Sequence, residues 1–114
     1  MVRRFLSVTV VLLACTAVTV ALADGAQRRR KPATHTVTIS GMQFTPSTVT
    51  VRAGDTVVWI NKDIVAHTAT SSAGSFDSRV IPPEKSWNFT FKAKGNNSYV
   101  CTYHPTMKGV VTVQ

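Results

Sequence analysis

Four side chains with metal-binding atoms stand out in this sequence. Three of them, Cys101, His104 and Met107, follow one another at three-residue intervals near the carboxyl end, and His67 lies further upstream. One thiolate, two imidazoles and one thioether make up the donor set that is typical of a blue-copper electron-transfer centre. Closing the long loop between His67 and Cys101 costs about 3 kcal/mol in chain entropy, whereas closing each of the three-residue loops between the other donors costs about 1 kcal/mol. A folded scaffold is therefore expected to bring His67 to the other three.

Other metal sites and catalytic sites fit these residues less well. Structural zinc prefers Cys and His without a thioether, so Met107 argues against it. Covalent haem needs a Cys-x-x-Cys-His motif, which the sequence lacks. A Cys–His hydrolase needs an orienting group and an oxyanion hole, which no motif marks, and a multicopper enzyme needs more than the three histidines present. The donor set predicts one copper ion that alternates between Cu(II) and Cu(I), in a carrier that is not an enzyme and has no small-molecule substrate.

Residues 1–23 have the pattern of a signal peptide. Arg3 and Arg4 precede an almost wholly apolar segment, residues 5–20, and Ala21-Leu22-Ala23 is a small-x-small cleavage site. We therefore expect a periplasmic or otherwise exported protein. The tetrapeptide that ends at Cys15 resembles a lipobox, so attachment to a membrane is expected only if Cys15 is lipidated.

The cysteine content supports the metal assignment independently of the spacing. With Cys15 removed or lipidated, Cys101 is the remaining thiol, and no disulfide within the chain can form. An unpaired thiol is a liability in an oxidising compartment, and a permanent metal bond protects it.

Positive charge is concentrated before the predicted domain. The formal net charge is +8, but four basic residues form the run Arg28-Arg29-Arg30-Lys31. From residue 35 onward seven basic and four acidic residues remain, so the domain carries only +3. Nucleic-acid-binding domains spread positive charge over a folded face, so no nucleic-acid partner is expected. Residues 24–34 are interpreted as a flexible basic lead-in, with binding to an acidic partner or an anionic lipid surface as the alternative role.

Residues 35–114 are predicted to form a single all-β domain. Alternating or short apolar runs predict strands at residues 35–40, 48–52, 56–61, 98–101 and 110–113. Residues 56–61 have the pattern of a strand covered on both faces, residues 68–78 that of a loop, and residues 95–97 that of a turn. His35 is expected to be exposed. Large aromatic side chains are expected in the core of a β-sandwich: Phe44, Trp59, Trp87, Phe89 and Phe91.

The order of several motifs resembles the cupredoxin family, and within it the plastocyanin and amicyanin group. The short loop with a Cys-x2-His-x2-Met pattern is similar to that of amicyanin. The matching segments span the predicted domain: Met42-Gln43-Phe44-Thr45-Pro46, Gly54-Asp55-Thr56-Val57-Val58-Trp59-Ile60-Asn61, His67-Thr68-Ala69-Thr70, Phe76-Asp77-Ser78, and Tyr99-Val100-Cys101 through His104-Pro105, Met107 and Gly109.

This resemblance implies a Greek-key β-sandwich with one blue-copper site. His67, Cys101 and His104 would bind copper in one plane, Met107 would be the weak axial ligand, and His104 would present its ring edge at an apolar surface patch. The protein would be a monomer that shuttles single electrons between transient redox protein partners. The alternative is a module for copper storage or delivery. Family members often carry Asn after the first histidine, where Thr68 stands here, and the Thr68 hydroxyl could hold the cysteine loop in the same way.

Overall fold

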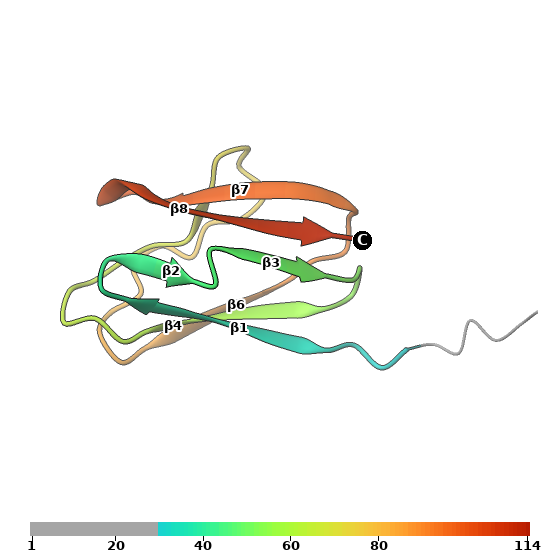
Figure 1. The fold of residues 1–114 in the computed structure, drawn as a ribbon, viewed down its shortest axis with the longest axis horizontal. Helices are drawn as coiled ribbons and strands as arrows, with labels where there is room; N and C mark the ends of the chain where they lie inside the picture. The colour runs from blue at the N-terminus through green and yellow to red at the C-terminus, as the bar shows by residue number, and fades with distance from the viewer. Residues whose placement is uncertain (1–29) are drawn as a thin grey trace, which may run out of the picture. The chain divides into compact units, whose positions relative to one another are not determined.

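Two four-stranded sheets face each other in residues 30–114, the part of the chain that this computed structural model describes (Figure 1). The first sheet contains β1 (Thr34–Ser40), β2 (Gln43–Thr45), β4 (Thr56–Asn61) and β6 (Ser86–Thr90), in the order β2-β1-β4-β6. The second contains β3 (Thr48–Val51), β5 (Thr70–Ser71), β7 (Gly95–Cys101) and β8 (His104–Val113), in the order β3-β8-β7-β5. The predicted all-β sandwich is confirmed.

The predicted signal peptide, its cleavage site, Cys15 and most of the basic lead-in lie outside the described residues. Residues 31–114 cluster as one structural unit, and β1 begins at Thr34, one residue before the predicted start of the domain. Within residues 30–114 no helix is long and apolar enough to cross a membrane.

Both sheets combine parallel and antiparallel neighbours. β1 pairs with β4 and β3 pairs with β8 in parallel, whereas the other neighbouring strands are antiparallel. Parallel neighbours cannot be joined by a tight hairpin, so the chain must leave the sheet between them. It does so by crossing to the opposite sheet at each connection from β2 through β7, as in Greek-key sandwiches.

The core lies between the sheets and is rich in aromatic rings. Trp59 is fully buried, and its ring centroid lies 5.4–6.4 Å from those of Phe76, Trp87, Phe91 and Tyr99. Among the predicted core aromatics, Phe44, Trp59 and Phe91 are buried, and Trp87 and Phe89 pack against them half-buried. This part of the prediction is confirmed.

The prediction that β4 is covered on both faces was wrong. Val57, Trp59 and Asn61 are buried, whereas Val58 and Ile60 are only half-buried. Successive side chains of a strand point to opposite faces, and only one face of this sheet packs against the second sheet. The continuous apolar run therefore overstates how much of the strand is covered.

Two short elements and one side chain also differ from expectation. Residues 68–78 are not a loop throughout, because β5 lies among them and pairs with β7. Residues 95–97 begin β7 and are not a turn. His35 is only 29% exposed, because its Nε2 atom lies 2.9 Å from Oδ2 of the buried Asp55 carboxylate.

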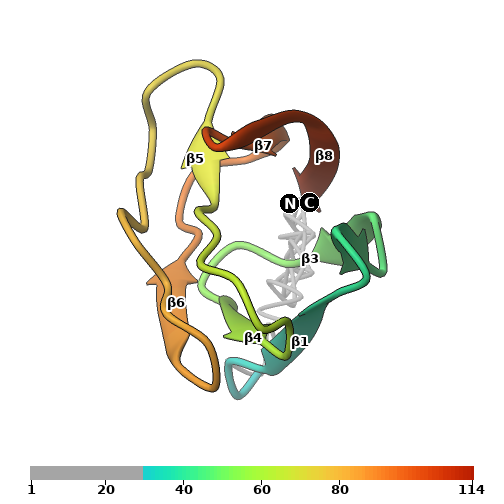
Figure 2. The same cartoon turned by 90° about the vertical axis from the view of Figure 1, so that its left-hand side faces the viewer.

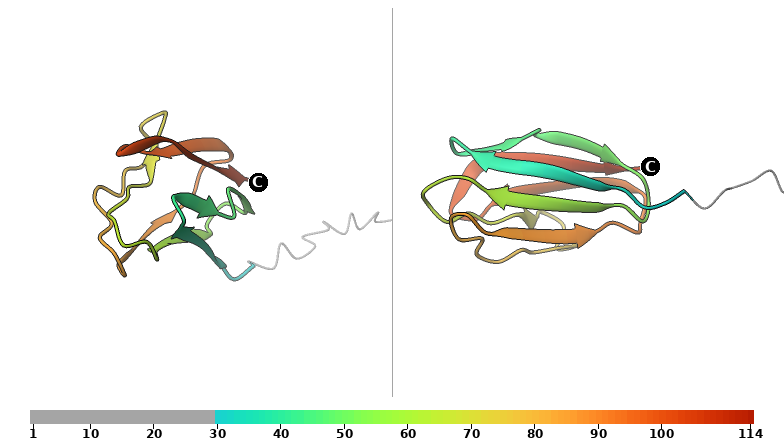
Figure 3. Two further views of the ribbon diagram at one scale, coloured as in Figure 1. Left: turned by 60° about the vertical axis from the view of Figure 1, so that its left-hand side comes forward. Right: turned by 90° about the horizontal axis from the view of Figure 1, so that it is seen from below.

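One end of the sandwich gathers segments that are far apart in the sequence. The β1–β2 turn, the segment that follows β4 and the β7–β8 turn all lie at the left end of the domain in Figure 1. Figure 2 looks onto this end, and the carboxyl terminus lies at the opposite end in both views of Figure 3. The predicted ligands lie at the end that carries the β1–β2 and β7–β8 turns.

Candidate metal centre

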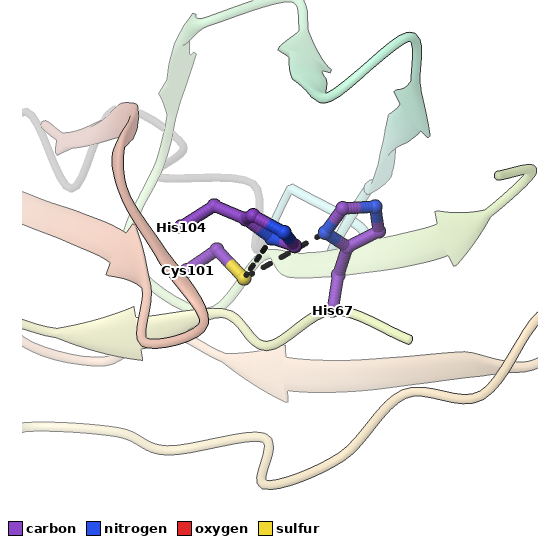
Figure 4. Close-up of side chains that lie close together, drawn as sticks. All are labelled: His67, Cys101 and His104. Atoms are coloured by element: carbon purple, nitrogen blue, oxygen red, sulfur yellow. Dashed lines mark hydrogen bonds between the residues drawn. The ribbon is translucent and has the colours of Figure 1, made fainter. Parts of the chain in front are cut away.

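Three of the four predicted donors meet at this end. Cys101 Sγ lies 3.6 Å from His67 Nδ1 and 3.7 Å from His104 Nδ1, and the three donor atoms lie within 4.8 Å of one another (Figure 4). Cys101 and His67 are fully buried, whereas His104 is half-buried. Among residues 30–114, no other group of three His, Cys, Asp or Glu side chains is close enough to share an ion.

The spacing of these atoms fits a single metal ion. Bonds of about 2.3 Å to sulfur and about 2.0 Å to nitrogen, meeting at about 120°, place the two donor atoms about 3.7 Å apart. The observed sulfur–nitrogen distances of 3.6 and 3.7 Å agree with this separation. A thiolate beside two imidazoles is also a set of soft and borderline ligands that suits copper. These side chains could therefore hold a copper ion with little rearrangement.

The β7–β8 turn supplies two of the donors. Cys101 ends β7, His104 begins β8, and the two residues are paired across the antiparallel ladder. The register shifts between Val100 and Cys101. Such irregularities bend a strand and redirect a side chain near functional sites. Local geometry therefore places Cys101 beside His104, as their short spacing predicts.

His67 is held by backbone hydrogen bonds to a segment that runs beside it. His67 N donates to Ile81 O at 3.2 Å, and Ile81 N donates to His67 O at 2.8 Å. Ser78 N likewise donates to Ala69 O at 3.0 Å. A folded scaffold thus delivers this distant donor, as the loop-closure argument predicts.

Asp63 fixes the ring of His67, although the sequence analysis did not identify it. Its Oδ2 atom lies 2.8 Å from His67 Nε2. A carboxylate can only accept a hydrogen bond, so Nε2 carries the ring proton and Nδ1 keeps the lone pair that a metal requires. The contact sets both the tautomer and the orientation of this candidate ligand.

The same carboxylate closes the β1–β2 turn over the site. Asp63 accepts hydrogen bonds from Gly41 N at 2.7 Å and Met42 N at 3.0 Å. Both residues have positive φ angles, 59° and 61°, as a two-residue hairpin turn requires, and this conformation is uncommon for methionine. Burial acts to raise the pKa of Asp63, but the hydrogen bonds from Met42, His67 and Gly41 outweigh it and hold the pKa below its usual value.

Thr68 occupies the position at which members of the family often carry Asn. Its Oγ1 atom accepts a hydrogen bond from Thr102 N at 2.9 Å, and its own N–H donates to Cys101 Sγ at 3.3 Å. The residue is 3% exposed. The hydroxyl therefore ties the His67 segment to the cysteine loop, which is the role that the sequence analysis suggested for it.

Met107 lies three residues beyond His104 in β8 and is 4% exposed. Together with Phe44, Gln43 and Lys108 it lines a hollow of about 620 Å³ between β2 and β8. Its burial and its place on the strand that carries His104 agree with a ligand position. The role of Met107 as fourth donor stays a prediction.

Comparison with known proteins gives matches over most of the chain. The cupredoxin-like domain family matches residues 9–113. Amicyanin-alpha of Methylorubrum extorquens is 33% identical over 110 residues, which cover 90% of this chain and 92% of that protein. Amicyanin of Paracoccus versutus is 31% identical over 83 residues, 68% of this chain, and the chain spans only 63% of its length.

Solved structures show the same arrangement of strands. A mutant of amicyanin in its Cu(I) form has a TM-score of 0.68 and 31% identity, over 71% of this chain and 82% of that chain. A copper-containing nitrite reductase from Thermus scotoductus SA-01 also reaches a TM-score of 0.68, at 26% identity, over 74% of this chain. The match covers only 23% of the reductase, so it concerns a fold shared with one part of a longer chain.

Proposed function

The chain belongs to the cupredoxin family, and on that premise we propose that it carries single electrons between redox proteins through one copper ion. The observation that carries the proposal is the convergence of Cys101 Sγ with the Nδ1 atoms of His67 and His104. We propose Met107, from the same loop and strand as His104, as the fourth and weakest donor.

Cu(I) and Cu(II) prefer different ligands and geometries, and this donor set lies between the two preferences. A bound copper ion would therefore supply one-electron exchange with little change in geometry. The chain contributes rigidity. Asp63 holds the ring of His67, and Thr68 holds both the sulfur of Cys101 and the peptide that follows it. Because these hydrogen bonds join protein atoms, they fix the donors independently of the ion.

His104 is proposed as the port through which electrons enter and leave. It is half-buried, whereas His67 is fully buried. Apolar side chains from the three segments at this end are exposed: Met42 is 41% exposed, Ile64 95% and Tyr103 53%. Exposed apolar residues that gather around a site mark an interaction surface. We propose that redox protein partners dock here briefly, over a small area, as transient electron-transfer complexes do.

The proposed carrier is a monomer in an exported or periplasmic location. A buried free thiol, Cys101, is safe in an oxidising compartment when a metal is bound to it. Attachment to a membrane is proposed only for a form lipidated at Cys15. Mass spectrometry of the native amino terminus distinguishes that form from one cleaved after Ala23.

Optical and paramagnetic-resonance spectra of the copper-loaded protein test the proposal. We expect an intense thiolate-to-copper charge-transfer band that disappears and returns on reversible one-electron reduction. Cys101→Ala should abolish the band, whereas His35→Gln, which removes an imidazole outside the proposed site, should retain it. A colourless wild-type protein, or full colour in Cys101→Ala, would refute the assignment.

Copper storage or delivery is the second candidate, because the same donors could hold cargo. A delivery site must exchange its metal, whereas donors fixed by hydrogen bonds should release it slowly. Rapid loss of copper to a chelator from a protein without the charge-transfer band would favour delivery. Slow loss from an intensely coloured protein would favour the carrier.

A further inference from the structure

One oxygen atom of Asp63 joins the candidate ligand His67 to the exposed β1–β2 turn. Asp63 Oδ2 accepts a hydrogen bond from His67 Nε2 at 2.8 Å and another from Met42 N at 3.0 Å. The other carboxylate oxygen, Oδ1, accepts from Gly41 N at 2.7 Å. The His67 ring and the Met42 amide therefore share one acceptor atom, whereas the Gly41 amide donates to the other.

The two donors to Oδ2 compete with each other. An N–H group that donates more strongly draws electron density from the oxygen, which then accepts less strongly from a second donor. Neighbouring hydrogen bonds change one another's strength by about 10–30% per bond. The main chain at Asp63 has little freedom to relieve the competition, because Asp63 N donates to Asn61 Oδ1 at 2.9 Å and Lys62 N donates to Ile39 O at 2.8 Å. A change at His67 Nε2 should therefore alter the bond from Met42 N.

The conformation of Met42 makes the turn sensitive to such a change. Its φ angle is 61°, in the left-handed region that methionine adopts uncommonly, and the bond to Asp63 helps to hold it there. Its side chain is 41% exposed, within the surface where we propose that redox partners dock. A weaker bond from Met42 N should therefore loosen part of that docking surface.

We propose that Asp63 couples the charge of the bound copper ion to the β1–β2 turn, so that a partner contacting the turn binds the Cu(I) and Cu(II) forms with different affinities. This inference rests on the proposed function of the site. A bound cation withdraws electron density from the imidazole of His67, and a divalent ion does so more strongly. His67 Nε2 is then the stronger donor in the Cu(II) form, and the bond from Met42 N is stronger in the Cu(I) form. Because coupling is reciprocal, a partner that orders the turn should favour Cu(I).

The competing explanation is the electric field of the ion, which would act on the turn through space. A field does not need the carboxylate, and it should affect the neighbouring amides of Gly41 and Met42 to a similar extent. The shared oxygen instead predicts a larger response at Met42, which disappears when the Asp63 carboxylate is removed.

NMR can compare the two charges, because Cu(I) and Zn(II) are both diamagnetic and Zn(II) carries the charge of Cu(II). Amide hydrogen exchange at Met42 should be about 1.3- to fourfold faster with Zn(II) than with Cu(I), and exchange at Gly41 should change less. This contrast should vanish in Asp63→Ala. It should persist in the matched control Glu84→Gln, which removes an exposed carboxylate that pairs with Lys62, next to Asp63 in the sequence.

Equal responses of the two amides in the wild type would overturn the inference in favour of the field. An unchanged Met42 response in Asp63→Ala would do the same. If Asp63→Ala does not fold, the contrast between the two amides in the wild type still decides the question.

Met42→Gly and Met42→Ala test the coupling in the opposite direction. Both remove the thioether, but only glycine adopts a positive φ angle without strain, so the N–H at this position should bond Asp63 more persistently in Met42→Gly. His67 Nε2 is then left with a weaker acceptor. Since a carboxylate partner raises the basicity of a histidine ligand, the reduction potential should be higher in Met42→Gly than in Met42→Ala. An equal or lower potential would contradict the coupling.

The metal-free protein separates this inference from the proposed function. The resonance of the His67 Nε2 proton should lie further upfield in Met42→Gly than in Met42→Ala, because its hydrogen bond is weaker. This difference in a protein that binds no copper would sustain the link through Asp63 and refute the proposed function. Identical resonances would overturn the link, even in a protein that carries electrons.

Discussion

Gly109 is the residue whose substitution most directly tests the packing beneath the metal centre. It lies in β8 opposite Tyr99 of β7, and a Cβ atom added to it would lie 2.3 Å from Tyr99 Cζ and 2.4 Å from the Tyr99 hydroxyl oxygen. Carbon atoms in contact lie about 3.5–4.0 Å apart, so the ring would have to retreat by more than about 1 Å. Tyr99 is 1% exposed and its ring centroid lies 4.7 Å from that of Phe44 and 5.4 Å from that of Trp59. The ring has no open space to enter.

We therefore expect Gly109→Ala to lower the free energy of unfolding by about 1–3 kcal/mol, the usual cost of overpacking a core. The φ angle of Gly109 lies outside the left-handed region, so alanine brings no backbone strain. Away from the clash, alanine in a strand should be about 0.5–1 kcal/mol more stable than glycine. In a Tyr99→Leu background, which lacks Cζ and the hydroxyl, Gly109→Ala should consequently be neutral or stabilising.

Urea unfolding of the metal-free wild type, the two single variants and the double variant completes a double-mutant cycle. The decisive result is the sign of the Gly109→Ala effect in the two backgrounds. An equal cost with and without the Tyr99 ring would refute the reasoning, as would a neutral Gly109→Ala in the wild-type background. Unchanged m-values, the slopes of the unfolding free energy against urea concentration, would show that unfolding exposes the same amount of surface in each variant.

Three further predictions concern the site and the core. Met107→Leu should keep copper but raise its reduction potential, because only the weak axial donor is lost; voltammetry measures this, and an unchanged potential would contradict the ligand role. Asp63→Asn removes a charged acceptor of hydrogen bonds from Gly41, Met42 and His67, and urea unfolding should show a loss of about 1–3 kcal/mol. Burial raises the pKa of Tyr99 to about 12. Because this phenol ionises earlier in the unfolded chain, near its ordinary pKa of about 10, the free energy of unfolding should fall by up to about 2–3 kcal/mol between about pH 10 and 12. Tyr99→Phe should lack that part of the fall, and an identical pH profile would contradict it.

The strands that could be predicted are those whose apolar residues alternate or form short runs. β1, β3 and β4 were located within one residue, because burial of one face leaves a period of two in the sequence. β5 has the sequence Thr70–Ser71 and carries no such pattern. It is held by pairing with Val100 and Tyr99 of β7, a contact between residues too distant in sequence for local patterns to reveal.

The candidate ligands could be recognised in the sequence because their chemistry is rare, whereas the residues that hold them in place could not. A thiol, imidazoles and a thioether at short spacing narrow the choice of metal. Asp63 lies four residues before His67, but its role depends on the β1–β2 turn, which presents Gly41 N and Met42 N to the same carboxylate. Nothing in the local sequence distinguishes this aspartate from the other acidic residues of the domain. Supports of this kind emerge only when the long-range pairing of strands is known.

The arrangement of these supports determines how metal binding and folding are related. In small zinc domains the ligands meet only when the ion is present, so binding supplies the folding free energy. Here His67 is fixed by Asp63 and by two backbone hydrogen bonds to Ile81, and the Cys101 loop is fixed by Thr68, through hydrogen bonds between protein atoms alone. Copper should then stabilise a fold that already exists, by an amount that grows with the logarithm of its free concentration above the dissociation constant. The proposed donors are thus held by the β-sandwich, so they should need to move little when the charge on a bound copper ion changes.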